Sequence, residues 1–251
     1  MLLEPRPDTR YIVSHQVTAE KFRSVPPELN REDVVVGQVE GRGLSRNRNN
    51  TLTMAGGDIA ILADDDAAYR PEYFDTVLRA FETDQSLEVA CFKIATPEGQ
   101  PEYKEYHGSV YALNEEEHHY ISSLEITFRL SSIISKGITF DERFGMGSGV
   151  ADYGEEAVFI YDCIRAGLTV KYIPEYIVEH SVESTLRAAT EYDPARNVFK
   201  GAYDARRYGL LAFPAAFYST LRLWPELKRS QVRPLKYLGE RLRGAAAIYG
   251  R

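Results

Sequence analysis

The sequence predicts an α/β protein with a mixed, mostly parallel sheet flanked by helices and a helical C-terminal tail. Short apolar runs at residues 34–36 and 59–63 alternate with helical patterns, an order typical of βαβ units. The chain has 251 residues, of which 44% are hydrophobic, so it is long enough to bury one large core. Because no repeat or low-complexity linker interrupts it, we expect the segment 196–251 to pack as helices on the same globule.

The predicted elements follow one another closely in the first third of the chain. A strand at 11–13 is followed by one at 34–36, and the segment 43–50 leads into a helix that ends at glycines 56–57. After the strand at 59–63, Pro71 begins a helix, because proline is favoured at the first helical position. The predicted apolar stripe of that helix consists of Phe74, Val77, Leu78 and Phe81.

Three carboxylates, Asp64, Asp65 and Asp66, come directly after the strand at 59–63. In open α/β sheets, ligands bind outside the carboxyl ends of the strands. Consecutive like charges repel one another unless a cation offsets them, and oxygen ligands suit Mg²⁺ or Mn²⁺ bound together with substrate phosphates. The cluster alone leaves open the alternative of an Asp-rich turn before a helix.

The segment around these acids resembles a known family. Residues 43–74, GLSRNRNNTLTMAGGDIAILADDDAAYRPEYF, resemble the nucleotide-sugar half of family 2 glycosyltransferases of the GT-A fold. The shared features are an Arg-Asn pair at the start of a helix, a Gly-Asp pair before the strand, a DxD motif and a proline seven residues after its first aspartate. In this chain they are Arg48, Asn49, Gly57, Asp58, Asp64, Asp66 and Pro71.

A second segment resembles the acceptor side of the same family. Residues 140–180 read FDERFGMGSGVADYGEEAVFIYDCIRAGLTVKYIPEYIVEH: a Gly-rich loop, two acids, a helix, a glycine, a strand, a proline and a histidine. Glu155-Glu156 stands where the family has Glu-Asp. The resemblance covers about residues 10–185 and implies a GT-A domain over 1–195. Within it we expect the nucleotide-sugar half at about 1–95 and the acceptor half at about 96–195, with a helical basic extension at 196–251.

The resemblance implies a metal site that offsets the charge of a departing nucleoside diphosphate. Asp66 is the expected direct ligand of Mn²⁺ or Mg²⁺, and Asp64 is expected to bridge the metal and the donor ribose. Asp65 points to the opposite side if the backbone is extended, so we place it around the donor. For His180, at the end of the second segment, metal ligation and an ordinary structural role both stay open.

Donor binding is expected at the start of the helix that follows residue 43. A helix N-terminus with a guanidinium favours a phosphate or a base carbonyl, so Arg48 with Asn49 is preferred over Arg46. A solvated Arg-rich turn is the alternative. Gln16, at the carboxyl end of the first strand, and Asp33 are further candidates for recognition of the nucleotide.

The general base is expected in the Glu155-Glu156 pair. Glu156 stands three, four and seven residues before Phe159, Ile160 and Cys163, so helical geometry predicts that it faces the protein body. Glu155 is then rotated by about 100° toward the flank. Acids are common at helix N-termini, which is the structural alternative. The second acid of the family motif is usually the base, so we favour Glu156 over Glu155.

The tail differs in charge from the body. Residues 196–251 contain 12 Lys or Arg and 3 Asp or Glu, whereas residues 1–195 contain 18 and 34. The acidic body argues against a nucleic-acid groove, and the basic tail suggests an anionic surface or an acidic partner. We expect residues 210–218, flanked by Arg206, Arg207 and Arg222 and kinked at Pro214, to contact a membrane surface. A helical lid on the body or a homodimer contact stays open.

Two cysteines without a metal-binding spacing, and a charged N-terminus unlike a signal peptide, favour a cytoplasmic protein, peripheral on the membrane if the tail binds it. The sequence predicts a metal-dependent, inverting glycosyltransferase that moves a sugar from a nucleoside-diphosphate sugar to a carbohydrate or lipid-linked glycan. The alternatives are a nucleotidyltransferase and a catalytically silent nucleotide-sugar or glycan-binding module.

Overall fold

The computed structural model describes residues 5–116, 121–182 and 192–250, and it confirms the α/β class with a mixed sheet flanked by helices. Strands β1 (Tyr11–Val17) and β2 (Val34–Glu40) form a parallel pair. The other strands form a five-stranded sheet in the order β3-β6-β4-β7-β5, in which β4 and β7 are parallel and the other neighbours antiparallel. Their bounds are β3 (Ile59–Ile61), β4 (Val89–Ala95), β5 (Tyr111–Ala112), β6 (Ile126–Arg129) and β7 (Val170–Glu179).

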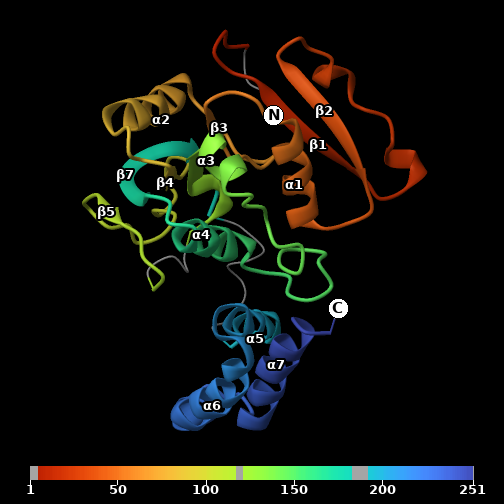
Figure 1. The fold of residues 1–251 in the computed structure, drawn as a ribbon, viewed down its shortest axis with the longest axis vertical. Coiled ribbons are helices and arrows are strands. Elements are labelled where there is room, and N and C mark those ends of the chain that lie inside the picture. Colours follow the sequence, from red (N-terminus) through yellow and green to blue (C-terminus); the bar gives the residue numbers. More distant parts are fainter. Residues whose placement is uncertain (1–4, 117–120, 183–191, 251) are drawn as a thin grey trace.

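Strand β4 shows how the two faces of this sheet are buried. Val89 and Cys91 belong to a core cluster that includes Phe159 and Cys163 of helix α4 (Glu155–Arg165). Phe92, on the opposite face, belongs to a second cluster with residues of helix α2 (Pro71–Thr83). Alternate residues of a strand point to opposite faces, so the two helices cover opposite sides of the sheet, as Figure 1 shows.

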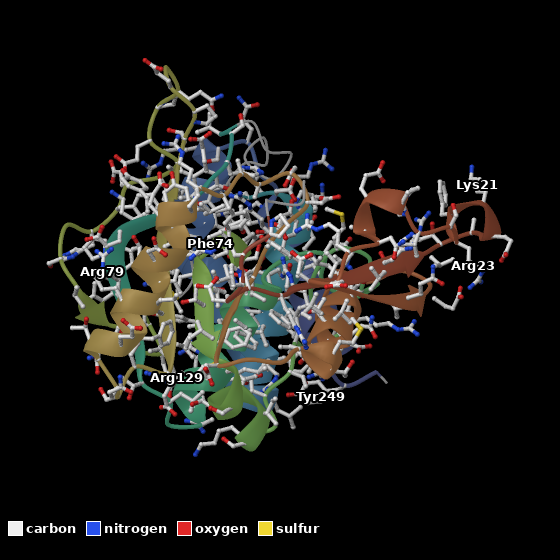
Figure 2. All side chains as sticks on the ribbon, turned by 90° about the horizontal axis from the view of Figure 1, so that it is seen from above. Lys21, Arg23, Phe74, Arg79, Arg129 and Tyr249 are labelled. Carbon is white, nitrogen blue, oxygen red and sulfur yellow. The ribbon has the colours of Figure 1, made fainter. Side chains whose placement is uncertain are left out.

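The predicted start of α2 at Pro71 is confirmed, but one part of its apolar stripe is wrong. Leu78 is 38% exposed, and Tyr73 is buried in its place together with Val77 and Phe81. The spacing of four residues in this buried set follows the helix period just as the predicted stripe did, so periodicity alone could not choose between them. Figure 2 shows Phe74 and Arg79 on this helix, on the opposite side of the molecule from Lys21 and Arg23.

The remaining helices of the body are short. Helix α1 (Leu44–Met54) packs against β1 and β2, and α3 (Leu130–Ser135) continues directly from β6. Three 3₁₀ turns complete the body: η1 (Glu20–Phe22), η2 (Pro27–Leu29) and η3 (Ser123–Glu125).

The C-terminal segment forms helices α5 (Pro194–Tyr208), α6 (Ala212–Arg229) and α7 (Pro234–Ala247), with the 3₁₀ turn η4 (Gly209–Leu211) between α5 and α6. Helices α5 and α7 cross in backbone contact. A Cβ atom added at Gly201 would lie 2.0 Å from the carbonyl oxygen of Arg241, and one added at Gly244 would lie 2.0 Å from that of Val198. Only glycine permits so close an approach of two helices.

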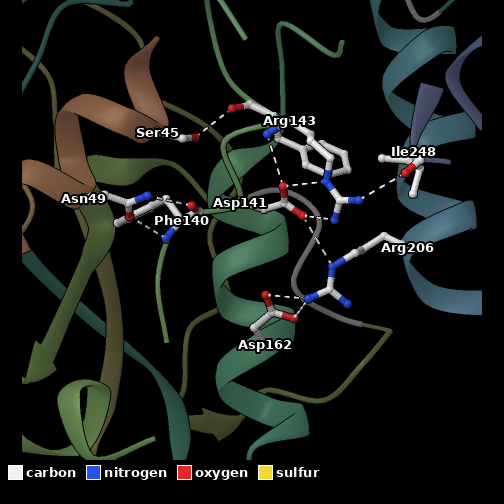
Figure 3. A network of polar contacts seen from close by, with 9 residues as sticks. Ser45, Asn49, Phe140, Asp141, Arg143, Asp162, Arg206 and Ile248 are labelled. Atoms are coloured by element: carbon white, nitrogen blue, oxygen red, sulfur yellow. Dashed lines mark hydrogen bonds and ion pairs between the residues drawn. The ribbon is translucent and has the colours of Figure 1, made fainter. Parts of the chain in front are cut away.

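These helices pack on the body through an apolar cluster and a polar network. The cluster joins Phe144, Val158 and Tyr161 of the body to Ala202 and Tyr203 of α5. In the network, the Arg206 guanidinium contacts carboxylate oxygens of Asp162 at 2.7 Å and Asp141 at 3.4 Å. Arg143 bonds both Asp141 and the Ile248 carbonyl, so two segments of the tail are tied to one loop of the body (Figure 3).

Within the described ranges, no helix is both long and apolar enough to cross a bilayer.

Candidate active site

The first part of the site is the acidic turn after β3. The amide of Leu62 donates to the carbonyl of Ile126, which keeps the turn beside β6. Asp64 accepts a 3.2 Å hydrogen bond from the Ser123 hydroxyl, and its side chain is 38% exposed. The Asp66 side chain is 71% exposed, and Asp65 is exposed as well. The acids therefore stand at the carboxyl end of a strand and remain accessible, as the sequence predicts.

Helix α1 carries the side chain that joins this turn to the second segment. Its first turn is held by the loop before α4, because the Leu44 amide donates to the Met146 carbonyl and the Ser45 hydroxyl to the Phe144 carbonyl. One turn later, the buried Arg48 guanidinium lies 2.9 Å from Glu155 Oε1 and 3.4 Å from Glu156 Oε1. Its other terminal nitrogen lies 3.6 Å from Asp64 Oδ1. One cation thus stands among three carboxylates.

The two glutamates do not face as the helix period predicts. Glu155 is the buried member, with only 5% of its side chain exposed, whereas the Glu156 side chain is 18% exposed. The prediction that Glu155 points to the flank is therefore wrong. Residues 157–161 are all buried, so α4 has core contacts nearly all round and the apolar stripe does not define one inward face.

The start of α4 is also covered by the tail. Gly154 precedes the helix with a φ of 78°, and a Cβ atom there would lie 2.1 Å from the Phe199 ring of α5. Glycine adopts this left-handed conformation without strain and leaves room for the ring. Helix α5 therefore packs against the turn that positions both glutamates.

Burial and the adjacent Glu156 carboxylate raise the pKa of Glu155 to about 8, against the opposing effect of Arg48. Two carboxylates that share a site cannot both ionise easily, so one keeps its proton. The pKa of Arg48 is raised because the three carboxylates outweigh its burial. Near neutral pH the buried Glu155 is therefore largely protonated.

The third part of the site brings Asp66 and His180 together. Ala68 and Glu179 exchange both backbone hydrogen bonds, so the acidic turn pairs with the end of β7, and Arg70 adds an ion pair to Glu179. His180 Nε2 then lies 3.3 Å from Asp66 Oδ1. Since the His180 Nδ1 atom lies 2.8 Å from the Ser181 carbonyl, which can only accept, Nδ1 carries a proton and donates it. In a neutral imidazole, Nε2 therefore presents its lone pair toward a carboxylate oxygen.

That arrangement fits a shared cation, because two acceptors at this distance need a proton or a metal ion between them. No group of three or more His, Cys, Asp or Glu in the described ranges could hold a metal ion by itself. Mg²⁺ is often bound by one or two carboxylates together with substrate phosphates, so a two-residue protein site is compatible with this class of ion. Asp64 does not join the pair, because it contacts Arg48 and Ser123.

The other residues predicted to bind the nucleotide-sugar donor, Asn49, Arg46 and Gln16, lie in different surroundings. The Asn49 amide is used by the body, because it donates to the Phe140 carbonyl and accepts from the Phe140 amide. Arg46 is exposed near the start of α1, and Gln16 donates to the Gly43 carbonyl at 3.3 Å. Gln16 therefore lies at the same end of the sheet as the first turn of α1.

Asp33 is not brought to this site. It precedes β2 and its carbonyl accepts from the Tyr11 amide at the beginning of β1, while its carboxylate pairs with Arg31. Because β1 and β2 are parallel, Asp33 lies at their amino ends, about 20 Å along the strands from Gln16. The expectation that Asp33 lies near Gln16 is therefore wrong.

Sequence reasoning missed Ser123, which orients Asp64 from η3. Ser122 and Glu125 form a reciprocal cap, in which the Glu125 carboxylate accepts from the Ser122 amide, and this fixes the turn that carries Ser123. The Ser-x-x-Glu spacing is a capping-box signal that could have located this turn in the sequence. It could not have shown that the turn contacts Asp64. A pocket of about 560 Å³ is lined by residues that include Lys136, Glu142 and Arg206. The acids of the candidate site do not line it: Asp64, Asp65, Asp66, Glu155 and Glu156.

The comparisons with known proteins agree with this geometry. Residues 20–140 match the family described as Glycosyl transferase family 2, a range that contains α1 and the acidic turn. The match covers 121 of the 251 residues, so this segment is similar to that family. No curated protein matches the chain at a significant level.

Solved structures show that the whole chain has the GT-A glycosyltransferase fold. TarS 1–349 of S. aureus in complex with UDP-GlcNAc is 15% identical, with a TM-score of 0.57 over 80% of this chain and 59% of that one. TarS 1–349 without a named ligand is 13% identical, with a TM-score of 0.57 over 79% and 56%. The chain thus spans less than two thirds of those TarS chains.

The mannosyltransferase PcManGT from Pyrobaculum calidifontis, in complex with GDP-Man and Mn²⁺, is 10% identical with a TM-score of 0.50. The alignment covers 98% of this chain and 79% of that one, so it includes the C-terminal helices as well as the body. At these identities the likeness concerns the fold.

Proposed function

We propose that this protein is a metal-dependent, inverting glycosyltransferase that moves a sugar from a nucleoside-diphosphate sugar to a carbohydrate acceptor, free or lipid-linked. The observation that carries the proposal is the position of Arg48 between Asp64 and the Glu155-Glu156 pair. Direct displacement needs stabilisation of a leaving diphosphate on one side of the sugar and a base on the other. Here the two sets of acids meet around one guanidinium.

On the donor side, Asp66 and His180 would hold Mn²⁺ or Mg²⁺, which would offset the charge that develops on the leaving diphosphate. Asp64, which accepts from Ser123 and is 38% exposed, would bind the donor ribose, with Asp65 beside it. Arg46 and Gln16, near the start of α1, are exposed or partly exposed and would contact the nucleotide. Glu40, which ends β2, is better placed for this than Asp33, because it lies at the carboxyl edge.

On the acceptor side, Glu156 would remove the proton from the attacking hydroxyl. It is the more exposed of the two glutamates, whereas burial raises the pKa of Glu155 to about 8 and favours the protonated form of Glu155. Of the two carboxylates, Glu156 is the one that an acceptor can reach more easily. Glu155 and Arg48 would then position the base without contacting the acceptor.

The donor is a nucleoside-diphosphate sugar of the kind seen with the structural neighbours, UDP-GlcNAc or GDP-Man. We place the reaction in the cytoplasm, since Cys91 and Cys163 are free and buried as expected of a reduced protein. The reaction of a nucleotidyltransferase assigns no role to Glu156. Nucleotidyl transfer is therefore the weaker alternative.

The experiment measures which product leaves the enzyme. Purified protein is incubated with UDP-GlcNAc or GDP-Man, Mn²⁺ and a panel of oligosaccharide acceptors, and the nucleotide products are separated. Acceptor-dependent release of UDP or GDP that stops on chelation supports the proposal. Pyrophosphate release from a nucleoside triphosphate would indicate a nucleotidyltransferase. A metal-dependent thermal shift with donors but no product would indicate a binding module.

A further inference from the structure

The outer face of α6 has a distribution of residues opposite to that of an ordinary surface helix. The residues that pack inward are mostly small: Ala212, Ala216 and Thr220, with Leu227. The large apolar side chains point outward instead. Leu210 and Leu211 of η4 are 71% and 69% exposed, and the face continues along α6 with Phe217, Tyr218 and Leu221 at 51%, 68% and 68%.

The spacing shows that these residues form one continuous stripe. Positions 210, 214, 217, 218 and 221 follow the helix period, so they lie along one side of the helix. We call this stripe, with Leu211, the outer face of α6. Pro214 belongs to the first turn of the helix, where no backbone hydrogen bond is lost, so we expect no kink there; Pro225, the proline inside the helix, follows the end of the stripe.

Of the three basic flanks that the sequence predicts, Arg206, Arg207 and Arg222, only Arg222 is an exposed cation beside this face. Arg206 is used by Asp141 and Asp162, and Arg207 is 10% exposed against the rings of Tyr161 and Tyr203. Their expected role as membrane-facing flanks is wrong. The exposed cations are Arg222, Lys228 and Arg229, at and beyond the C-terminal end of the stripe, and no ion pair within the described ranges involves them.

We infer that the outer face of α6 binds an anionic lipid surface, with its apolar side chains in the interface and these cations at the headgroups. A helix with large exposed apolar residues and basic edges has the composition of an interfacial helix. Figure 1 shows α6 at the end of the molecule away from the β-strands, so a flat surface can approach it without meeting the body.

The cations also argue against a second copy of the chain as the occupant. In a twofold dimer the same patch faces itself, so Arg222, Lys228 and Arg229 would stand opposite their own copies with one acid of α6 per chain against three cations. Glu226, the acidic residue of α6, bonds the Tyr192 hydroxyl instead. An anionic bilayer supplies the complementary charge that a copy does not.

The test is co-sedimentation with vesicles of phosphatidylcholine, with and without phosphatidylglycerol, at low and high salt. The chain has one tryptophan, Trp224 of α6, so its emission gives a second readout from the same helix. We expect the full-length protein to pellet with the phosphatidylglycerol vesicles, with a blue shift of Trp224 emission, and high salt to weaken both.

Paired variants separate the two contributions. Leu210→Ser with Leu221→Ser should weaken vesicle binding by more than about tenfold, whereas Ile134→Ser, at a 60% exposed position of α3, should leave it unchanged. Arg222→Gln with Arg229→Gln should weaken it by about 25-fold at low salt, at about fivefold for each cation. Arg79→Gln with Lys136→Gln removes the same charge from exposed positions of the body and is the matched control.

Either of two results overturns the inference. One is that the full-length protein fails to pellet with phosphatidylglycerol vesicles, or that the control variants lose as much binding as the α6 variants. The other is that analytical ultracentrifugation finds a dimer that Leu210→Ser with Leu221→Ser dissociates, which would assign the outer face of α6 to a second copy. Sugar transfer need not be measured, so failure here leaves the proposed function untouched.

Discussion

The crossing of α5 and α7 gives a sharp prediction, because one helix contains both a crowded glycine and an open one. In α7, a Cβ atom at Gly244 would lie 2.0 Å from the Val198 carbonyl oxygen, whereas a Cβ atom at Gly239 meets nothing within 4 Å. Gly239→Ala should raise the free energy of unfolding by about 0.5–1 kcal/mol, the usual gain from replacing glycine inside a helix.

Gly244→Ala should have the opposite effect. Ordinary contact begins near 3.4 Å, so α5 and α7 must separate by about 1.4 Å, and the contacting atoms are backbone that cannot rotate away. Overpacking of this kind costs about 1–3 kcal/mol, so the variant should be less stable than Gly239→Ala by about 2 kcal/mol or more. Gly201→Ala, which meets the Arg241 carbonyl at 2.0 Å, should behave like Gly244→Ala.

The assay is urea unfolding followed by far-ultraviolet circular dichroism and by Trp224 emission, which reports on the neighbouring helix α6. If the helices unfold as one unit with the body, both signals should shift together to lower urea in the Gly244→Ala variant. Equal midpoints for Gly244→Ala and Gly239→Ala would refute the close crossing of α5 and α7.

The acids of the site give three more predictions. Glu156→Gln should lower the turnover rate by about 10² or more with little change in donor affinity, and Glu155→Gln should lower it less; the reverse order in steady-state kinetics would make Glu155 the base. Asp66→Asn and His180→Gln should each weaken Mn²⁺ binding measured by titration calorimetry, and a bound ion that neither variant affects would show that the metal lies elsewhere. The folded-state pKa of Glu155, about 8, lies above its ordinary value of 4.5, so its contribution to stability is present at low pH and lost as the pH rises through about 8. Urea midpoints of the wild type relative to Glu155→Gln should therefore fall between about pH 5 and about pH 9, and parallel pH profiles would contradict the raised pKa.

The sequence predicted the parts of the fold that depend on local signals. Pro71 marks the start of α2, and the apolar run before Asp64 marks β3, because both follow from backbone restriction and burial along one segment. Packing of α4 on all sides could not be read from its period, which is why the orientation of Glu155 was wrong. Helix direction depends on what surrounds the helix, and the Phe199 ring against Gly154 comes from a distant segment.

The candidate site was predicted in its composition more than in its contacts. Arg48, Asp64 and Glu155 were each identified, but their meeting joins residues 107 positions apart, which one sequence without aligned relatives does not reveal. Asp33 was misplaced because the sequence did not show that the strands at 11–13 and 34–36 pair in parallel, which puts Asp33 at the end opposite to Gln16. Tertiary contacts, rather than local preferences, decided each of these points.

The paired backbone of Ala68 and Glu179 restricts how the site can tolerate changes in chain length. Asp66 lies in the turn that directly precedes this pair, so deletion of Ala67 would shorten the connection and displace Asp66 from His180. An insertion of one residue between Glu179 and His180 would have the same effect from the other strand. Insertions and deletions of single residues should therefore be rare at these positions among functional homologues, even where the identity of Ala67 itself varies.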